Sequence, residues 1–148
     1  MGIDISIYAE KKRQNKWEFF MPQKNFNDVG YCEPLDIGGR IPALFQILSR
    51  LYEDKYYGKN FKYISDNRGI PADSCEEIKY YLEDEYRCSY VYLNEILEFE
   101  WNAESKEYGI YKEIVGEQFF ANVVTYLQSA LQDGVTEKDI RIVFGYNS

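Results

Sequence analysis

Histidine is absent from the 148 residues of this chain, and cysteine is scarce. Histidine is the commonest general base and metal ligand near neutral pH. Its absence excludes a Ser-His-Asp triad, a Cys-His pair and a histidine-based zinc site within the chain. The three cysteines, Cys32, Cys75 and Cys88, are widely spaced and form no C-x-x-C pair. This pattern argues against a zinc knuckle or a disulfide framework and favours a reducing compartment.

Positive charge and long apolar runs are also in short supply. Lysine and arginine number 17 against 25 aspartates and glutamates, which gives a net charge of −8. Binding to DNA or RNA requires cations opposite the phosphates, so this balance argues against direct nucleic-acid binding. It fits a protein partner, a small ligand in a locally basic pocket, or mimicry of nucleic acid. No apolar run approaches the roughly 18 residues of a membrane span, and no signal peptide opens the sequence, so we expect a cytoplasmic protein without a membrane segment.

Hydrophobic residues make up 45% of the chain, and 15 residues are tyrosines. This composition suffices for one hydrophobic core and for aromatic surfaces, so we expect a single domain over residues 1–148. The alternation of apolar and polar side chains over residues 3–10 is typical of a half-buried β-strand.

Periodicity and turn residues predict the remaining elements. Residues 11–16 are polar and lead into a second strand, and Ser74 with Glu77 has the spacing of a helix capping box. We expect strands at 3–10, 17–21 and 140–144, an extended piece at 89–92, and helices or helical turns at 42–58, 75–86, 93–101 and 117–131. The predicted fold class is α+β, with a small, mostly antiparallel sheet made of the N-terminal hairpin and the C-terminal strand. About three to four helices cover one face of this sheet.

Five segments, in order, resemble a family of small proteins found in phages, prophages and some bacteria. That family typically opens with Met-Gly-Cys-Asp-Ile-His and tends to end in Phe-Asp-Asn. The matching segments here are Met1-Gly2-Ile3-Asp4-Ile5-Ser6, residues 40–45, 68–73 and 89–96, and Phe144-Gly145-Tyr146-Asn147. The early histidine of the family is Ser6 in this chain, and its late aspartate is lost or replaced by Asn147. The resemblance implies a phage setting, in which the cytoplasm would be that of the host cell, but no mechanism.

A candidate binding surface lies on the polar side of the first strand. Asp4, Ser6 and Glu10 share that side, and Arg141 lies beside them if the last strand is the neighbour of the first. Arginine binds phosphate or carboxylate in pairs and tyrosine stacks on bases, so an open cleft here would suit a nucleotide. The alternative is a solvated face whose ion pairs hold loops in place. The candidate ligand-binding residues are Asp4, Ser6, Glu10, Arg40, Arg68, Tyr90 and Arg141.

Acidic residues offer two further interpretations. A mid-chain cluster either presents a DNA-like charge surface to a host protein or only increases solubility. Asp4 and Glu10 are the residues a metal-dependent hydrolase would use, although nothing in the sequence specifies their geometry. The mid-chain cluster consists of Glu83, Asp84, Glu85, Glu95, Glu98, Glu100 and Glu104.

Taken with the resemblance, these features favour a non-enzymatic accessory binding protein that antagonises a host defence system. It would either sequester a small nucleotide signal or block a host defence protein. No catalytic residue, metal or cofactor is assigned, and exposed tyrosines are compatible with a homo-oligomer. The alternative function is a metal-dependent hydrolase that uses carboxylates.

Overall fold

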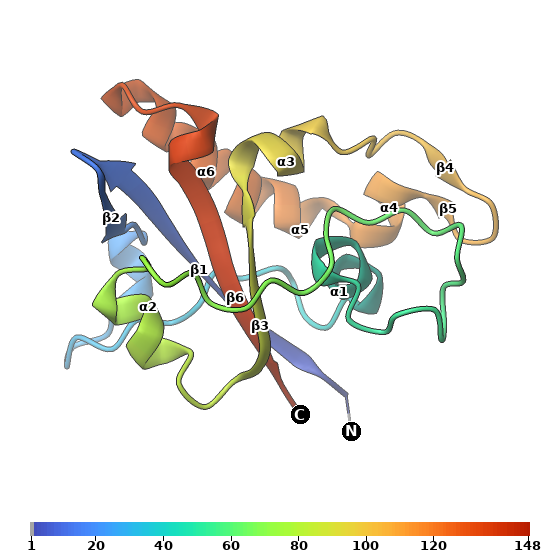
Figure 1. Ribbon diagram of the computed structural model, residues 1–148, viewed down its shortest axis with the longest axis horizontal. Helices are drawn as coiled ribbons and strands as arrows, with labels where there is room; N and C mark the ends of the chain where they lie inside the picture. The colour runs from blue at the N-terminus through green and yellow to red at the C-terminus, as the bar shows by residue number, and fades with distance from the viewer. Residues whose placement is uncertain (1) are drawn as a thin grey trace.

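Four antiparallel strands form the central sheet of the protein (Figure 1). A computed structural model describes residues 2–148 and confirms the α+β fold class. The strands lie in the order β2-β1-β6-β3, and β1 and β6 are the central pair. Their bounds are Asp4–Arg13 for β1, Lys16–Phe19 for β2, Tyr86–Tyr92 for β3 and Ile140–Asn147 for β6.

The register of the sheet follows from one tight turn and one long-range pairing. Gln14 and Asn15 connect β1 to β2 with φ values of 51° and 62°, the left-handed geometry of the favoured two-residue hairpin turn. β6 pairs with β1 from Asp4 opposite Asn147 to Lys11 opposite Ile140. The two ends of the chain therefore lie side by side, as the sequence predicted (Figure 1).

Two predicted helices are shorter in the structure. α1 spans Pro42–Ser49 and ends where Arg50 adopts a left-handed conformation, so the predicted continuation to residue 58 is wrong. The buried Gln46 explains this end, because its side-chain amide donates to the carbonyl of Glu53 and accepts from the N–H of Tyr52. α2 spans only Glu76–Tyr81. The predicted Ser74–Glu77 capping box is not formed there.

The remaining elements are short helices and turns and the two-stranded hairpin β4–β5. The segment predicted as one helix at 117–131 includes a π-helical turn, in which the N–H of Thr125 bonds to the carbonyl of Phe120. No helix within residues 2–148 combines the length and the apolar character needed to cross a membrane. The bounds are Leu93–Glu98 (α3), Glu104–Ser105 (β4), Gly109–Ile110 (β5), Tyr111–Val115 (α4), Glu117–Phe119 (α5), Phe120–Val124 (π turn), Thr125–Ser129 (α6), and Gln23–Asn25, Ala130–Asp133 and Glu137–Asp139 (3-10 turns).

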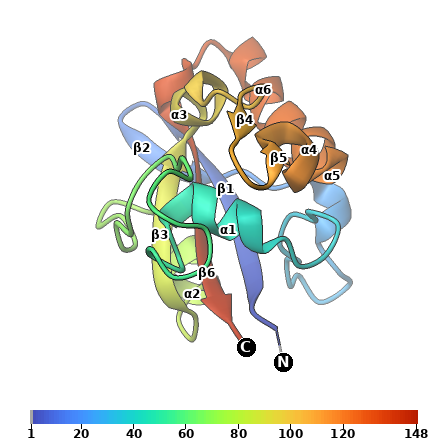
Figure 2. The same cartoon turned by 90° about the vertical axis from the view of Figure 1, so that its right-hand side faces the viewer.

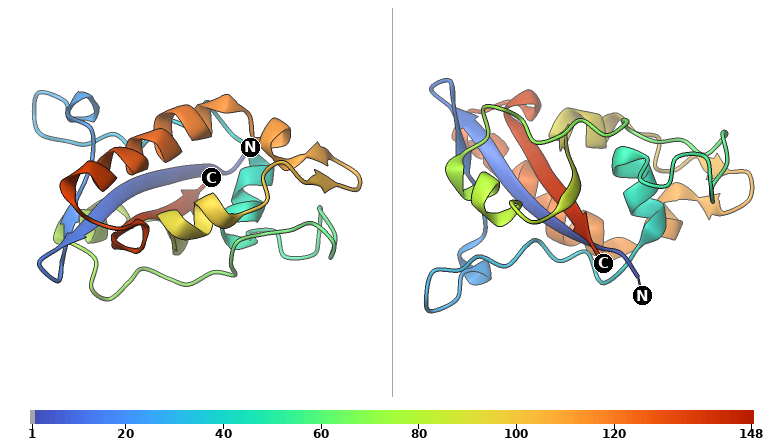
Figure 3. Two further views of the ribbon diagram at one scale, coloured as in Figure 1. Left: turned by 90° about the horizontal axis from the view of Figure 1, so that it is seen from above. Right: turned by 60° about the horizontal axis from the view of Figure 1, so that its bottom comes forward.

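Both faces of the sheet are covered, which corrects the prediction of one open face. Ile7, Ile142 and Phe144 point into the main core beneath α1 and α4–α6. Tyr8 and Val143 point the other way, into a second cluster with Ile78 and Leu82 at α2. α2 and α6 consequently lie on opposite sides of the sheet (Figure 3). The polar cleft expected on an open face is filled by α2 and its neighbouring loops.

Candidate functional site

Glu10 and Arg141 form an ion pair inside the protein. They face each other across β1 and β6, with 2.6 Å between Glu10 Oε1 and Arg141 Nε, and are 0% and 1% exposed. Arg141 Nη2 also donates to Asp73 Oδ1 at 3.0 Å, and the guanidinium carbon lies 3.6 Å from the centre of the Trp17 ring. Burial alone would lower the pKa of Arg141, but Glu10 and Asp73 raise it above its ordinary value.

The carboxylate of Glu10 explains how α2 begins without its expected cap. Ser74 Oγ donates to Glu10 Oε1 at 2.9 Å, and the backbone N–H of Cys75 donates to Glu10 Oε2 at 3.1 Å. A glutamate from a distant strand thus accepts from a backbone donor at the start of this helix. Glu10 therefore joins the sheet to α2, which is a structural role.

Arg68 and Tyr90 lie next to this network. Arg68 binds Glu95 through two hydrogen bonds of 2.7 and 2.5 Å, and its Nη1 donates to the carbonyl of Tyr90. The guanidinium carbons of Arg68 and Arg141 lie 5.3 and 5.6 Å from the centre of the Tyr90 ring. Burial alone would raise the pKa of Glu95, but Arg68 lowers it below its ordinary value. The structure therefore brings together four of the seven predicted residues, Glu10, Arg68, Tyr90 and Arg141, but its two arginines bind carboxylates of the protein and do not line an open cleft.

The other predicted residues lie elsewhere along β1. Asp4 binds Arg40 at 2.7 and 3.2 Å in an exposed pair at the far end of the strand, and Ser6 lies opposite Gly145. At about 3.3 Å per residue, the six steps from Asp4 to Glu10 span roughly 20 Å, too far for one metal ion. No group of three or more metal-ligating side chains occurs within residues 2–148. This geometry gives no support to the hydrolase alternative.

The hollow nearest to the buried network is acidic. It has a volume of about 560 Å³ and lies between β2 and the start of α2. Its charged lining consists of one lysine and four carboxylates, so it repels a phosphate group. The predicted arginines Arg40, Arg68 and Arg141 already bind carboxylates of the protein. Nucleotide binding by these arginines stays a prediction, and the hollow beside them does not suit a phosphate group. The lining residues that carry charge are Lys16, Glu18, Asp73, Glu76 and Glu77.

A different hollow has the chemistry that the sequence led us to seek. It has a volume of about 280 Å³ and lies between the segment 54–61, which follows α1, and the loop that joins β4 to β5. Figure 2 shows these two segments at one end of the molecule, beside α1. Aromatic rings form its wall, with 5.2 Å between the centres of Tyr57 and Tyr108 and 5.8 Å between those of Phe61 and Tyr108. We call it the aromatic–lysine pocket; its lining includes Lys55, Tyr56, Tyr57, Lys59, Phe61, Lys106 and Tyr108.

The charge of the aromatic–lysine pocket is opposite to that of the whole protein. Three lysines line it, and within residues 2–148 none of them forms an ion pair. Of the two lining carboxylates, Asp54 is bound by Arg50 at 3.1 Å, which leaves Glu107 as the opposing charge. A chain with a net charge of −8 thus carries a locally positive aromatic hollow.

Hydrogen bonds hold the two walls of this pocket together. Tyr108 Oη donates to the carbonyl of Tyr56 at 2.8 Å across the pocket. Ser105 Oγ donates to the carbonyl of Gly109 at 2.7 Å and fixes the β4–β5 turn, where Gly109 has a φ of 95°. None of the lining residues of this pocket is among the candidate residues predicted from the sequence. The sequence nevertheless indicates the pocket through two short segments that combine lysine with tyrosine, at 55–59 and 106–108.

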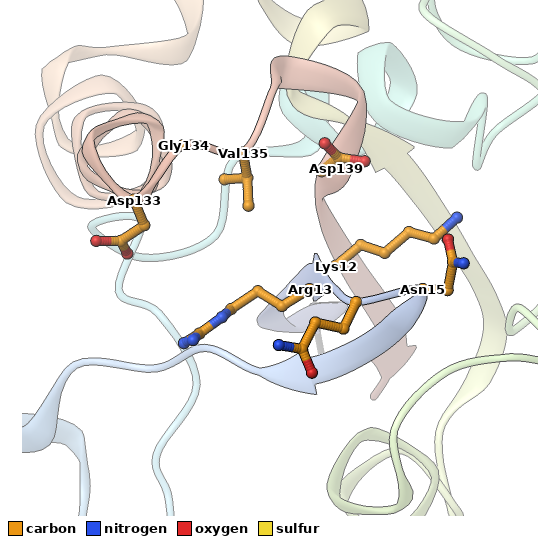
Figure 4. Close-up of a pocket in the computed structure, with 8 residues that line it drawn as sticks. Lys12, Arg13, Asn15, Asp133, Gly134, Val135 and Asp139 are labelled. Atoms are coloured by element: carbon orange, nitrogen blue, oxygen red, sulfur yellow. The ribbon is translucent and has the colours of Figure 1, made fainter.

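A third hollow lies at the tip of the β1–β2 hairpin (Figure 4). Its volume is about 480 Å³, and the side chains of Lys12 and Arg13 extend from the hairpin in different directions. Asp133 and Asp139 line the opposite side, so two cations face two carboxylates. This hollow has neither an aromatic wall nor an excess of positive charge.

The three cysteines are held as neutral thiols. Burial raises the pKa of Cys32 to about 11, that of Cys75 to about 12, and that of Cys88 above its ordinary value. An unfolded thiol has a pKa of about 8.5, so at about pH 8 we expect iodoacetamide to alkylate native Cys32 and Cys75 at least on the order of a hundredfold more slowly than in urea, and Cys88 also more slowly. Mass spectrometry of timed samples measures this ratio. A thiol that reacts equally fast in both states would contradict the expectation.

Comparisons of this chain with models of protein families, with characterised proteins and with solved structures find no match. The choice among the hollows rests on their chemistry. Of the three, the aromatic–lysine pocket combines stacking surfaces with more lysines than carboxylates, and these lysines form no ion pair in the part of the chain that the structure describes.

Proposed function

We propose that the protein is a non-enzymatic accessory protein of phage type that binds a small aromatic anion, such as a nucleotide, in the aromatic–lysine pocket. The observation that carries the proposal is the wall of tyrosines beside three lysines that form no ion pair among the described residues 2–148. A base that stacks on a tyrosine gains about 1–3 kcal/mol. Lysines at the rim bind the phosphate as point charges.

The size of the pocket limits the ligand. Small-molecule sites usually measure about 300–1,000 Å³, so a hollow of about 280 Å³ takes one ring system. An adjoining hollow of about 420 Å³ shares Lys59, Asn60 and Phe61 and adds Lys62 together with the carboxylates Glu98 and Glu100, so the phosphate is expected at the shared Lys59. A mononucleotide fits this arrangement, with its base in the aromatic–lysine pocket and its sugar and phosphate over the shared lysine.

The biological setting of the proposal comes from the resemblance to phage proteins. In that setting, capture of a nucleotide would withdraw a signal that a host defence system depends on. Capture requires only that the ligand is bound and kept. We therefore expect the ligand to be released from the protein chemically unchanged.

The direct test is calorimetric titration with ribonucleoside monophosphates and cyclic dinucleotides, with inorganic phosphate and the free nucleosides as controls. At least one nucleotide should bind and raise the Tm, while phosphate alone and the nucleosides should bind more weakly. Mass spectrometry should recover the same nucleotide after heating. Failure of every nucleotide to bind would contradict the proposal, and conversion that requires Mg²⁺ or Mn²⁺ would favour the hydrolase alternative.

Tyr108→Ala should weaken nucleotide binding about tenfold, because a lost stacking contact is worth about 1–3 kcal/mol. Tyr108→Phe is the matched control, since it keeps the ring and removes only the hydrogen bond to the carbonyl of Tyr56. Titration calorimetry of the two variants measures the difference. Equal affinities of the alanine and phenylalanine variants would show that the ligand does not stack on this ring.

A further inference from the structure

An exposed apolar surface lies around α2, at the opposite end of the molecule from the aromatic–lysine pocket (Figure 1). Val29 is 88% exposed, Tyr80 is 69% exposed and Tyr31 is 45% exposed. Large apolar side chains that gather on a surface mark interaction sites more often than isolated ones do. We call this surface, made of Val29, Tyr31, Tyr80 and Tyr81, the tyrosine face.

The centre of the tyrosine face is rigid. The ring of Tyr81 stacks on that of Tyr8 at 5.0 Å, and its hydroxyl accepts from the N–H of Cys32 at 3.0 Å. Tyr31 and Tyr80 each contact the ring of Tyr81 at a centroid distance of 5.4 Å. The exposed rings are therefore placed by a side chain that is itself fixed against the sheet.

The tight loop that carries Tyr31 also exposes Val29, two positions earlier in the chain. Asn27 Oδ1 accepts from the N–H groups of Val29 and Tyr31, each at 3.0 Å, and the N–H of Asn27 donates to the carbonyl of Tyr31 at 2.9 Å. Gly30 completes the turn with a φ of 83°. The loop is ordered without a partner, so binding would require little further loss of conformational entropy.

Carboxylates surround the tyrosine face. The lysine of α2, Lys79, forms an ion pair with Glu76, with 3.8 Å between Nζ and Oε1. Two copies that met through this surface would place acid against acid, because a twofold interface joins the same patch on both subunits. The exposed carboxylates are Asp28, Glu33, Glu76, Glu77, Glu83 and Asp84.

From this charge complementarity we propose that the tyrosine face docks a lysine- or arginine-rich segment of a protein partner that also carries an apolar side chain. The apolar side chain packs between Val29 and Tyr80, and the cations of the partner meet the surrounding carboxylates. An arginine also stacks on an exposed tyrosine ring. The proposal is independent of nucleotide binding at the other end of the protein.

The test is selection from a display library of random 16-residue peptides on the purified protein, followed by affinity measurements on synthesised winners. Enriched peptides should be basic, should contain an apolar residue and should bind more weakly as salt is added. The double variant Val29→Ser/Tyr80→Ala should weaken their binding at least tenfold, and the charge reversal Glu83→Lys/Asp84→Lys should do the same. Tyr108→Ala is the control and should leave peptide binding unchanged.

Several results would overturn the proposal. These are the absence of enrichment, selection of neutral or acidic peptides, and equal binding to both double variants and to the unchanged protein. A dimer in sedimentation that dissociates in the Val29→Ser/Tyr80→Ala variant would identify a second copy as the occupant instead. The substituted side chains are exposed, so the Tm of each variant should match that of the parent, which separates lost docking from lost folding.

Discussion

Replacing Arg141 with methionine should lower the free energy of unfolding by about 3–5 kcal/mol. The Glu10 carboxylate would remain buried, 0% exposed, after its partner at 2.6 Å is removed. A domain of this kind has a total stability of about 5–15 kcal/mol, so this one substitution would remove a large part of it. Urea unfolding followed by fluorescence measures the change.

The double variant Glu10→Gln/Arg141→Met tests the cause of this loss. A neutral glutamine removes the uncompensated charge and keeps an oxygen that accepts from Ser74 or Cys75. We expect it to recover more than half of the lost stability. Arg40→Met, which breaks the exposed pair with Asp4, should leave the urea midpoint nearly unchanged. A similar midpoint for Arg141→Met and Arg40→Met would show that burial does not govern the contribution of these pairs.

Phe144→Ala should also lower the free energy of unfolding by about 3–5 kcal/mol. Phe144 is fully buried in β6, where it lies opposite Ile7 on β1 and Ser89 on β3. Removal of the ring leaves a cavity in the main core, between the sheet and the helices that cover this face. Urea unfolding again gives the value.

Phe144→Leu is the matched control for this cavity, because it removes less volume and keeps an apolar side chain in the core. Its loss of stability should be clearly smaller than that of the alanine variant. Equal losses would mean that the ring itself, rather than the filled volume, stabilises the site, for example through its edge contact with Tyr146 at 6.0 Å.

Local patterns predicted the strands well, because alternation is a property of neighbouring residues. The alternating residues 3–10 form most of β1, but β1 continues to Arg13, so the turn predicted at 11–16 is limited to Gln14 and Asn15. The order of the terminal strands also followed from the sequence. Both results depend on rules that act over a few residues or on simple topology.

The cover on the second face was not predictable in the same way. α2 has six residues, and its contact with Tyr8 and Val143 comes through Ile78, through Tyr81, whose ring stacks on Tyr8, and through Leu82, which directly follows the helix. Loops that lack periodicity supply the rest of the cover. A signal was nevertheless present in β6, where Val143 lies between Ile142 and Phe144, since apolar side chains on both sides of a strand indicate burial on both faces.

The candidate site also has a part that local patterns predict and a part that depends on tertiary packing. Strand pairing predicted that Glu10 and Arg141 would meet, but only the structure shows that they are buried. The aromatic–lysine pocket joins two turn-rich segments, 54–61 and 105–108, that no sequence period connects. Their proximity depends on how α1 and the β4–β5 hairpin pack, which is a tertiary property.

The central position of β6 has a consequence for how the protein acquires its structure. Glu10 and Arg141 are neighbours in the sheet but lie 131 positions apart in the chain. Contacts of such long range slow folding, because a long loop must close before they form. During synthesis, β1 cannot pair with its central partner until nearly all of this sequence has been translated. The backbone edge of β1 that pairs with β6 therefore remains open to chaperones, and to other nascent chains, for most of that time.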